Sequence, residues 1–119
     1  MATFVLVHGA YHGGGCWRDV ASRLVAAGHA VFTPTLTGLG ERAHLATPDV
    51  DLETHVADLI AIFDFEDLAD VILVGHSYGG MVVGTVADRL ADRIRGLVYL
   101  DALIPENGKS VTDIQPPAR

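Results

Sequence analysis

Short apolar runs rich in β-branched residues alternate with segments of helical periodicity along this chain. Four such runs predict strands, over residues 3–8, 30–33, 71–75 and 94–100. Between them, the spacing of apolar residues predicts helices over 16–27, 52–65 and 78–90. Alternating strands and helices form right-handed crossover units. The sequence therefore predicts an α/β fold, with one parallel, doubly wound sheet of about four strands and helices on both faces.

The pentapeptide Gly75-His76-Ser77-Tyr78-Gly79 joins the third predicted strand to the third predicted helix. In this strand, turn and helix context, G-x-S-x-G is the pattern called a nucleophile elbow. A serine hydroxyl is a weak nucleophile, and a strained turn between small neighbours lifts it clear of the chain. The following helix points amide groups at the turn, where an oxyanion would form. Ser77 is therefore the predicted nucleophile, and an ordinary turn serine is the alternative.

A glycine-dense loop, residues 9–15, follows the first predicted strand. In a doubly wound sheet, the first and third strands are neighbours where the strand order reverses, and ligands bind above that point. We therefore predict an oxyanion hole formed by the backbone N–H groups of Ala10 and Tyr78. A flexible connector is the alternative for the loop. A phosphate cradle is disfavoured, because neither glycine-rich nucleotide-binding pattern is present.

Four further residues flank the predicted nucleophile and oxyanion loop: His8, Gly9, His12 and His76. We expect His8 to brace the loop through a ring hydrogen bond rather than to act in catalysis. His12 is expected near the pocket mouth, and His76 beside the elbow, where it shapes the turn. Trp17 is expected to pack over the sheet.

The charge balance limits the partners of the chain. Fifteen acidic residues against eight basic ones give a net charge of -7, without a Lys/Arg cluster that would favour nucleic acid or an anionic membrane surface. The histidines show no metal-ligand spacing. No apolar run approaches the ~20 residues that would span a bilayer. The loop at 35–51, with two glycines and Pro48, is predicted to hold no structural element.

The single cysteine, Cys16, excludes an internal disulfide and is expected to be a packed small residue. Met1 leads directly into a predicted strand, without a basic leader segment. Together these two features predict a cytoplasmic location.

Residues 4–10, 12–14 and 74–80, with Trp17, resemble the α/β-hydrolase fold family. Within it they are most similar to the branch of plant methylesterases, hydroxynitrile lyases and bacterial esterase relatives. The resemblance runs from residue 3 to about 105. It implies a Ser-acid-His triad, a small-molecule ester or acyl substrate, no cofactor, and a helical cap after the strand that ends at Asp101. Residues 1–105 would then be the N-terminal part of a hydrolase core, and 106–119 the start of the cap or a frayed tail.

Two positions depart from that branch. The lyases carry Glu where this chain has His76, which favours esterase chemistry over cyanohydrin chemistry. Many members carry Trp where this chain has Gly15, which would loosen the pocket wall there.

The family's triad follows the chain order Ser, acid, His, but no histidine follows Ser77. The six histidines stand at positions 8, 12, 29, 44, 55 and 76. Without a general base a comparable serine hydrolase loses about 10⁶-fold in rate. We therefore predict that this chain is the N-terminal half of a hydrolase and is inactive alone. A self-contained site that uses His12 and Asp101 is the less favoured reading.

The predicted function is a serine hydrolase that acts on a small neutral or apolar ester or a related acyl compound. A ligand-binding or receptor protein without turnover is one alternative; an inactive fragment, or a half-protein that pairs with a second chain bearing the histidine, is another. The strand at 94–100 would form an apolar sheet edge, and such edges recruit other chains. Residues 1–119 expressed alone are therefore predicted to self-associate.

Overall fold

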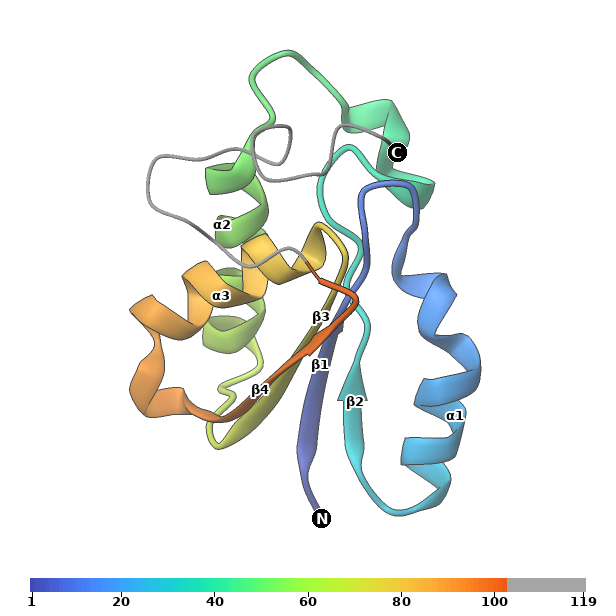
Figure 1. Ribbon diagram of the computed structural model, residues 1–119, viewed down its shortest axis with the longest axis vertical. Coiled ribbons are helices and arrows are strands. Elements are labelled where there is room, and N and C mark those ends of the chain that lie inside the picture. The colour runs from blue at the N-terminus through green and yellow to red at the C-terminus, as the bar shows by residue number, and fades with distance from the viewer. Residues whose placement is uncertain (103–119) are drawn as a thin grey trace.

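The computed structural model describes residues 1–102, which form a four-stranded sheet covered by helices (Figure 1). The strands are β1 (Thr3–Val7), β2 (Ala30–Phe32), β3 (Val71–His76) and β4 (Ile94–Leu100). The α-helices are α1 (Arg18–Ala26), α2 (Leu52–Phe65) and α3 (Gly79–Arg89), and the 3₁₀ helices are η1 (Gly14–Trp17), η2 (Gly40–Leu45) and η3 (Ala91–Arg93). All strand pairs are parallel, so the predicted α/β fold is confirmed.

The strand order is β2-β1-β3-β4, and it reverses between β1 and β3. Strand β1 is paired with β3 along the whole of β1, with Val7 opposite Gly75, one residue before the end of β3. The segments that follow β1 and β3 therefore leave the sheet side by side. This is the switch point at which the sequence predicts a ligand site.

The helices cover the two faces of the sheet separately (Figure 1). Side chains alternate between the faces along each strand. On β1, Val5 and Val7 are buried in the cluster that includes Leu59 of α2 and Val82 of α3. Leu6, between them, belongs to a smaller cluster on the face that α1 covers.

Helix α2 begins and ends at the predicted residues because its signals are local. Its N-terminus has a capping box: the Thr54 amide donates to Asp51 Oδ1 over 3.1 Å, and the Asp51 amide donates to Thr54 Oγ1 over 3.2 Å. Apolar residues then line one face. At the end of α1, Gly28 has a φ of +93°, the left-handed conformation expected of a residue that ends a helix.

The prediction that residues 35–51 hold no structural element was wrong. Helix η2 lies within this segment. Gly40 turns the chain with a φ of +50° as the helix begins. The helix is tied back to Thr35, whose hydroxyl donates to Glu41 Oε2 (2.7 Å) and whose carbonyl accepts from Arg42 Nη1 (2.9 Å). These bonds form only when the loop closes on itself, so local composition does not reveal them.

The expectation that Cys16 is packed was wrong. Cys16 is exposed rather than packed, because it lies on the outer side of η1 while the neighbouring Trp17 takes the buried position.

The domain boundary predicted at residue 105 lies outside the described residues. Among residues 1–102, no helix is long and apolar enough to cross a membrane.

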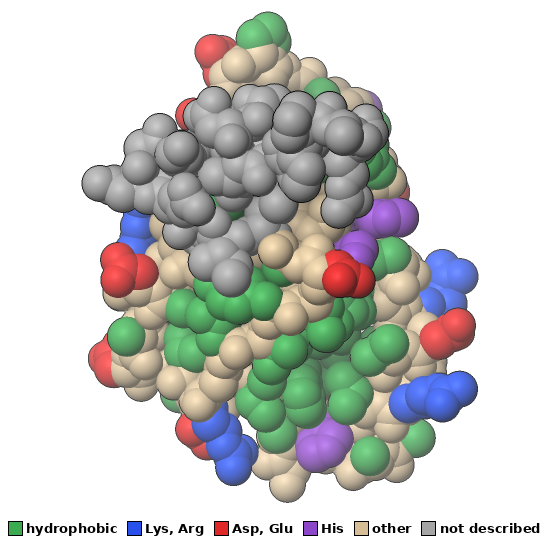
Figure 2. Space-filling model, viewed as in Figure 1, with side chains coloured by type: hydrophobic (Ala, Val, Ile, Leu, Met, Phe, Trp, Pro, Cys, Tyr) green, Lys and Arg blue, Asp and Glu red, His purple; other side chains and the backbone are tan. Residues whose placement is uncertain are grey.

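Strand β4 forms one edge of the described sheet and leaves large apolar side chains in contact with solvent. The exposed fractions are 37% for Leu97, 39% for Val98 and 45% for Leu100. Figure 2 shows hydrophobic side chains gathered on the face that carries this strand. The apolar character expected of this edge is therefore present.

Candidate active site

Ser77 occupies the turn between β3 and α3 with a φ of +55°. Residues other than glycine rarely adopt this left-handed conformation, which costs of order 1–3 kcal/mol and occurs mainly at functional sites. The turn is closed by the Gly80 amide, which donates to the Ser77 carbonyl over 2.9 Å. Ser77 therefore has the backbone conformation expected of an elbow.

Glycines on either side of Ser77 permit this turn. A Cβ on Gly75 would stand 2.6 Å from Val83 Cγ2 and 2.7 Å from the Gly79 carbonyl oxygen. A Cβ on Gly79 would stand 2.5 Å from the carbonyl oxygen of Val7. Both positions therefore require glycine for close approach of the chain to itself.

The loop after β1 packs directly against the serine. A Cβ on Gly9 would lie 3.1 Å from Ser77 Cβ and 3.5 Å from Ser77 Oγ. The loop turns at once, because the His12 amide donates to the Gly9 carbonyl over 3.2 Å. Within residues 1–102, the N–H groups of Ala10 and Tyr78 donate no hydrogen bond. The fold thus brings together the two segments predicted to carry the oxyanion donors.

His8 is fully buried and uses both ring nitrogens. Nδ1 bonds the Gly9 carbonyl over 2.7 Å, and Nε2 lies 3.0 Å from the Leu36 amide. A carbonyl only accepts and an amide only donates, so Nδ1 carries the proton and the ring is neutral. Burial lowers the pKa of His8, in keeping with this state. The ring hydrogen bond predicted for His8 is therefore present.

His12 and His76 lie on the α1 side of the elbow. Their ring centroids are 6.2 Å apart, and His76 also meets Trp17 edge to face at 6.3 Å. These three side chains, with Cys16, Val20 and Leu100, line a hollow of about 320 Å³. Trp17 both packs on the sheet with Leu6 and Val74 and forms a wall of this hollow.

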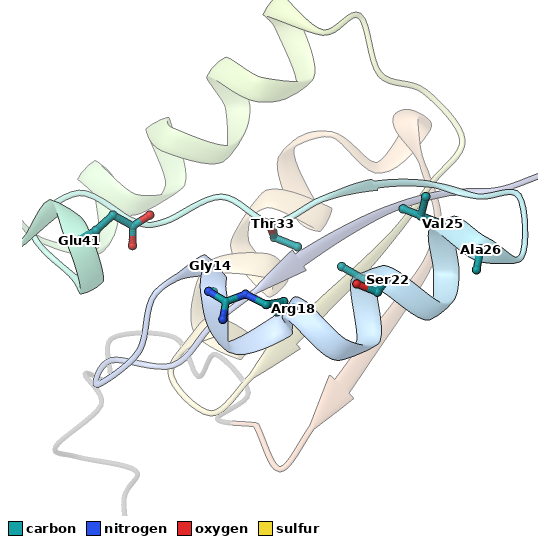
Figure 3. A pocket seen from close by; sticks show the side chains of 9 residues that line it. Gly14, Arg18, Ser22, Val25, Ala26, Thr33 and Glu41 are labelled. Carbon is teal, nitrogen blue, oxygen red and sulfur yellow. The ribbon is translucent and has the colours of Figure 1, made fainter.

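A second hollow, of about 620 Å³, lies along α1 (Figure 3). Its walls include Arg18, Ser22 and Val25 of α1, and Thr33 and Glu41 from the opposite side. None of the predicted site residues lines it. The chemistry expected at Ser77 therefore does not use it.

The sequence analysis missed a contact to the residue after the serine. The hydroxyl of Tyr78 lies 2.7 Å from Nδ1 of His55, a buried residue of α2. Burial, with smaller contributions from the charges of Asp51 and Asp58, raises the pKa of Tyr78 to about 12, so the hydroxyl stays protonated. The sequence signal was a histidine next to the apolar positions Val56 and Leu59 of the predicted helix.

No histidine among residues 1–102 is hydrogen-bonded to Ser77, and Asp101 is exposed after the end of β4. The same residues contain no group of three or more His, Cys, Asp or Glu side chains that could hold a metal ion. The described chain therefore presents a serine and two free amides without a bonded base.

Residues 4–119 match the alpha/beta hydrolase family. The chain belongs to this family. It is 60% identical over 118 residues to a carbendazim hydrolyzing esterase of Nocardioides sp. (strain SG-4G), covering 99% of this chain and 49% of that protein. It is 32% identical over 114 residues to methylesterase 2 of Arabidopsis thaliana, covering 94% of this chain and 43% of that protein.

The fold agrees with solved hydrolases. An extracellular α/β-hydrolase from a Paenibacillus species superposes with a TM-score of 0.90 at 38% identity, covering 99% of this chain and 48% of that one. An alpha-hydroxynitrile lyase of Arabidopsis thaliana is also similar, at 36% identity over 105 residues, covering 87% of this chain and 40% of the lyase. The predicted branch is therefore confirmed. This hydrolase chain spans about half the length of the relatives it matches.

Proposed function

We propose that Ser77 is the nucleophile of an esterase whose acid and histidine come from sequence outside these 119 residues. The observation that carries this proposal is the left-handed φ of +55° at Ser77, held against Gly9 of the oxyanion loop. Left-handed strain at a serine between a buried strand and a helix is typical of an elbow rather than of an ordinary turn.

The chemistry proceeds by acyl transfer. Ser77 Oγ attacks the substrate carbonyl carbon as the base takes the hydroxyl proton, and the carbonyl oxygen becomes negative. The amides of Ala10 and Tyr78 bind that oxyanion, which is the reason that free N–H groups matter here. The alcohol leaves with a proton, and water then releases the acid from the serine ester.

The substrate class is a small neutral or apolar ester or a related acyl compound. The hollow that includes His76 of the elbow is about 320 Å³ and has apolar walls from Trp17, Val20 and Leu100. Ser77 is not among its lining residues, so it supports this class only as an apolar space next to the elbow. The name of the 60% identical relative makes carbendazim one compound to test, and p-nitrophenyl acetate is a general ester probe.

The test uses the full-length protein, meaning the product of the complete reading frame that contains these residues. A fluorophosphonate probe should label Ser77, and Ser77→Ala should abolish both labelling and ester hydrolysis. Ser22→Ala, at a serine of α1 in the other hollow, is the matched control and should keep both. Hydrolysis that survives Ser77→Ala would refute the proposal.

The alternatives make different predictions in the same experiment. A receptor without turnover would bind a small ester and leave Ser77 unlabelled. A half-protein would gain labelling only when a second chain bearing the histidine is added. Residues 1–119 alone should be inactive, because no described histidine is hydrogen-bonded to Ser77.

A cytoplasmic location belongs to the same proposal, and fractionation of the source cells tests it.

A further inference from the structure

Two buried histidines tie the two segments proposed to bind the oxyanion to two consecutive residues, Leu36 and Thr37. His8 joins the carbonyl of Gly9, beside the Ala10 amide, to the amide of Leu36. His55 joins the side chain of Tyr78 to the carbonyl of Thr37 over 2.8 Å. The segments that carry the two free amides are thus connected through neighbouring residues of the loop after β2.

The partners of His55 determine its tautomer. The Thr37 carbonyl can only accept, so Nε2 carries the proton and donates to it. Nδ1 is then free to accept the hydroxyl proton of Tyr78, and the two rings meet edge to face with centroids 5.5 Å apart. His55 therefore uses both nitrogens, and in this arrangement its tautomer is opposite to that of His8.

A second residue of helix α2 also forms hydrogen bonds with Thr37. Asp58, three residues after His55 and so on the same helix face, accepts from the Thr37 amide over 2.7 Å and from its hydroxyl over 2.8 Å. Thr37 is therefore held at its carbonyl, amide and hydroxyl. A rigid anchor of this kind lets His55 restrain the Tyr78 side chain instead of following its motion.

Within residues 1–102, the hydrogen bonds that hold the main chain of Tyr78 all come from the first turn of α3. Tyr78 lies between the strained Ser77 and the first residue of α3, and within residues 1–102 its amide donates no hydrogen bond. The Tyr78 N–H shares a peptide plane with the Ser77 carbonyl, which accepts from the Gly80 amide over 2.9 Å, and the Tyr78 carbonyl accepts from the Met81 amide over 2.9 Å. The side-chain bond to His55 adds a restraint from outside α3, on the far side of the residue.

We propose that His55 is a positioning residue, which aims the Tyr78 amide at the oxyanion by holding the Tyr78 hydroxyl against the anchored Thr37. The inference rests on the proposed function. Removing an oxyanion donor costs about 10²- to 10³-fold in kcat, so loosening one should cost less, about tenfold. The loss should fall on kcat rather than KM, because the oxyanion forms only in the transition state.

The experiment compares Tyr78→Phe, His55→Gln and His55→Leu with the wild type in the full-length protein, using p-nitrophenyl acetate. Tyr78→Phe and His55→Leu should each lower kcat about tenfold, with KM within about twofold, and the double variant should be no worse than either. His55→Gln should recover part of the loss, since its amide can donate and accept at similar positions. Tyr99→Phe, the same change at a half-buried tyrosine of β4, is the matched control and should leave kcat unchanged.

Additive losses in the double variant, equal losses for Gln and Leu at position 55, or an unchanged kcat in Tyr78→Phe would each overturn the proposal. Nitrogen-15 NMR of the wild type gives a readout that needs no activity and no variant. It should show His55 protonated at Nε2 and unprotonated at Nδ1, and any other state overturns the proposal. If His55 has this tautomer but the probe does not label Ser77, the result counts against the proposed function and not against the His55 contact.

Discussion

Gly79 of α3 touches the end of β1, where a Cβ on it would stand 2.5 Å from the carbonyl oxygen of Val7. The carbonyl oxygen of His8 would be 2.7 Å away. Both neighbours are backbone atoms of the sheet and its exit, so neither can rotate aside. The contact fixes how closely the N-terminus of α3 approaches the start of the loop after β1.

We predict that Gly79→Ala destabilises the full-length protein by more than the ~1–3 kcal/mol usual for overpacking, because rigid backbone must move. Gly15→Ala is the control, since its Cβ would meet only the Arg18 guanidinium at 3.6 Å. Urea unfolding followed by circular dichroism measures both. Equal midpoints for the two variants would contradict the prediction.

Because the backbone at Ser77 is strained, a substitution that relieves the strain should stabilise the fold while it removes the activity. Ser77→Gly should relieve the left-handed backbone and raise the free energy of unfolding by about 1 kcal/mol relative to Ser77→Ala, which keeps a Cβ. Both variants should lose probe labelling. The comparison is made by denaturant unfolding, and a Gly variant less stable than the Ala variant would show that the turn is not strained.

His8 predicts a pH dependence of stability. Its pKa is lowered by burial in the folded state, so between that pKa and about 6.5 the unfolded chain binds more protons than the folded one. Stability is then complete above pH 6.5 and falls as the pH drops towards the folded pKa. Protonation of His8 would also place a hydrogen on Nε2. That nitrogen could then no longer accept from the Leu36 amide, and two donors would face each other.

Thermal unfolding across pH 4.5 to 7.5, with His8→Gln as the comparison, checks this. The Gln variant keeps an acceptor for Leu36 but does not titrate, so its melting temperature should fall less steeply below pH 6.5. A direct NMR titration of the His8 ring should give a midpoint below the ordinary value. A midpoint above the ordinary value would mean that His8 stabilises the fold more as the pH falls, which would contradict the prediction.

The exposed edge strand predicts self-association of residues 1–119 expressed alone. Leu97 and Val98 of β4 are each more than a third exposed beside unpaired backbone groups of a sheet edge. Val98→Lys should weaken the association, and Val25→Lys, at an exposed apolar residue of α1, should not. Sedimentation velocity distinguishes these outcomes. A monodisperse wild-type monomer at tens of micromolar would refute the prediction.

Much of the fold could be predicted because its signals are local. Strand β4 and helix α2 have the bounds that their apolar spacing predicts, and α2 is capped by Asp51 and Thr54 within one turn. The neighbourhood of β1 and β3 follows from the doubly wound topology that alternating strands and helices predict. The position of Ser77 follows from glycine spacing between a strand and a helix.

Only the tertiary structure decided the contacts that join distant segments. His55 and Tyr78 are 23 positions apart, and His8 and Leu36 are 28 apart, so no window of sequence holds both partners. Helix η2 was missed for the same reason, because its bonds to Thr35 form when the loop closes. The sequence by itself determined the strands, the α-helices and the place of the proposed nucleophile, since propensity and periodicity act over a few residues. Packing decided which buried polar groups pair, because each must find a partner wherever the folded chain places one.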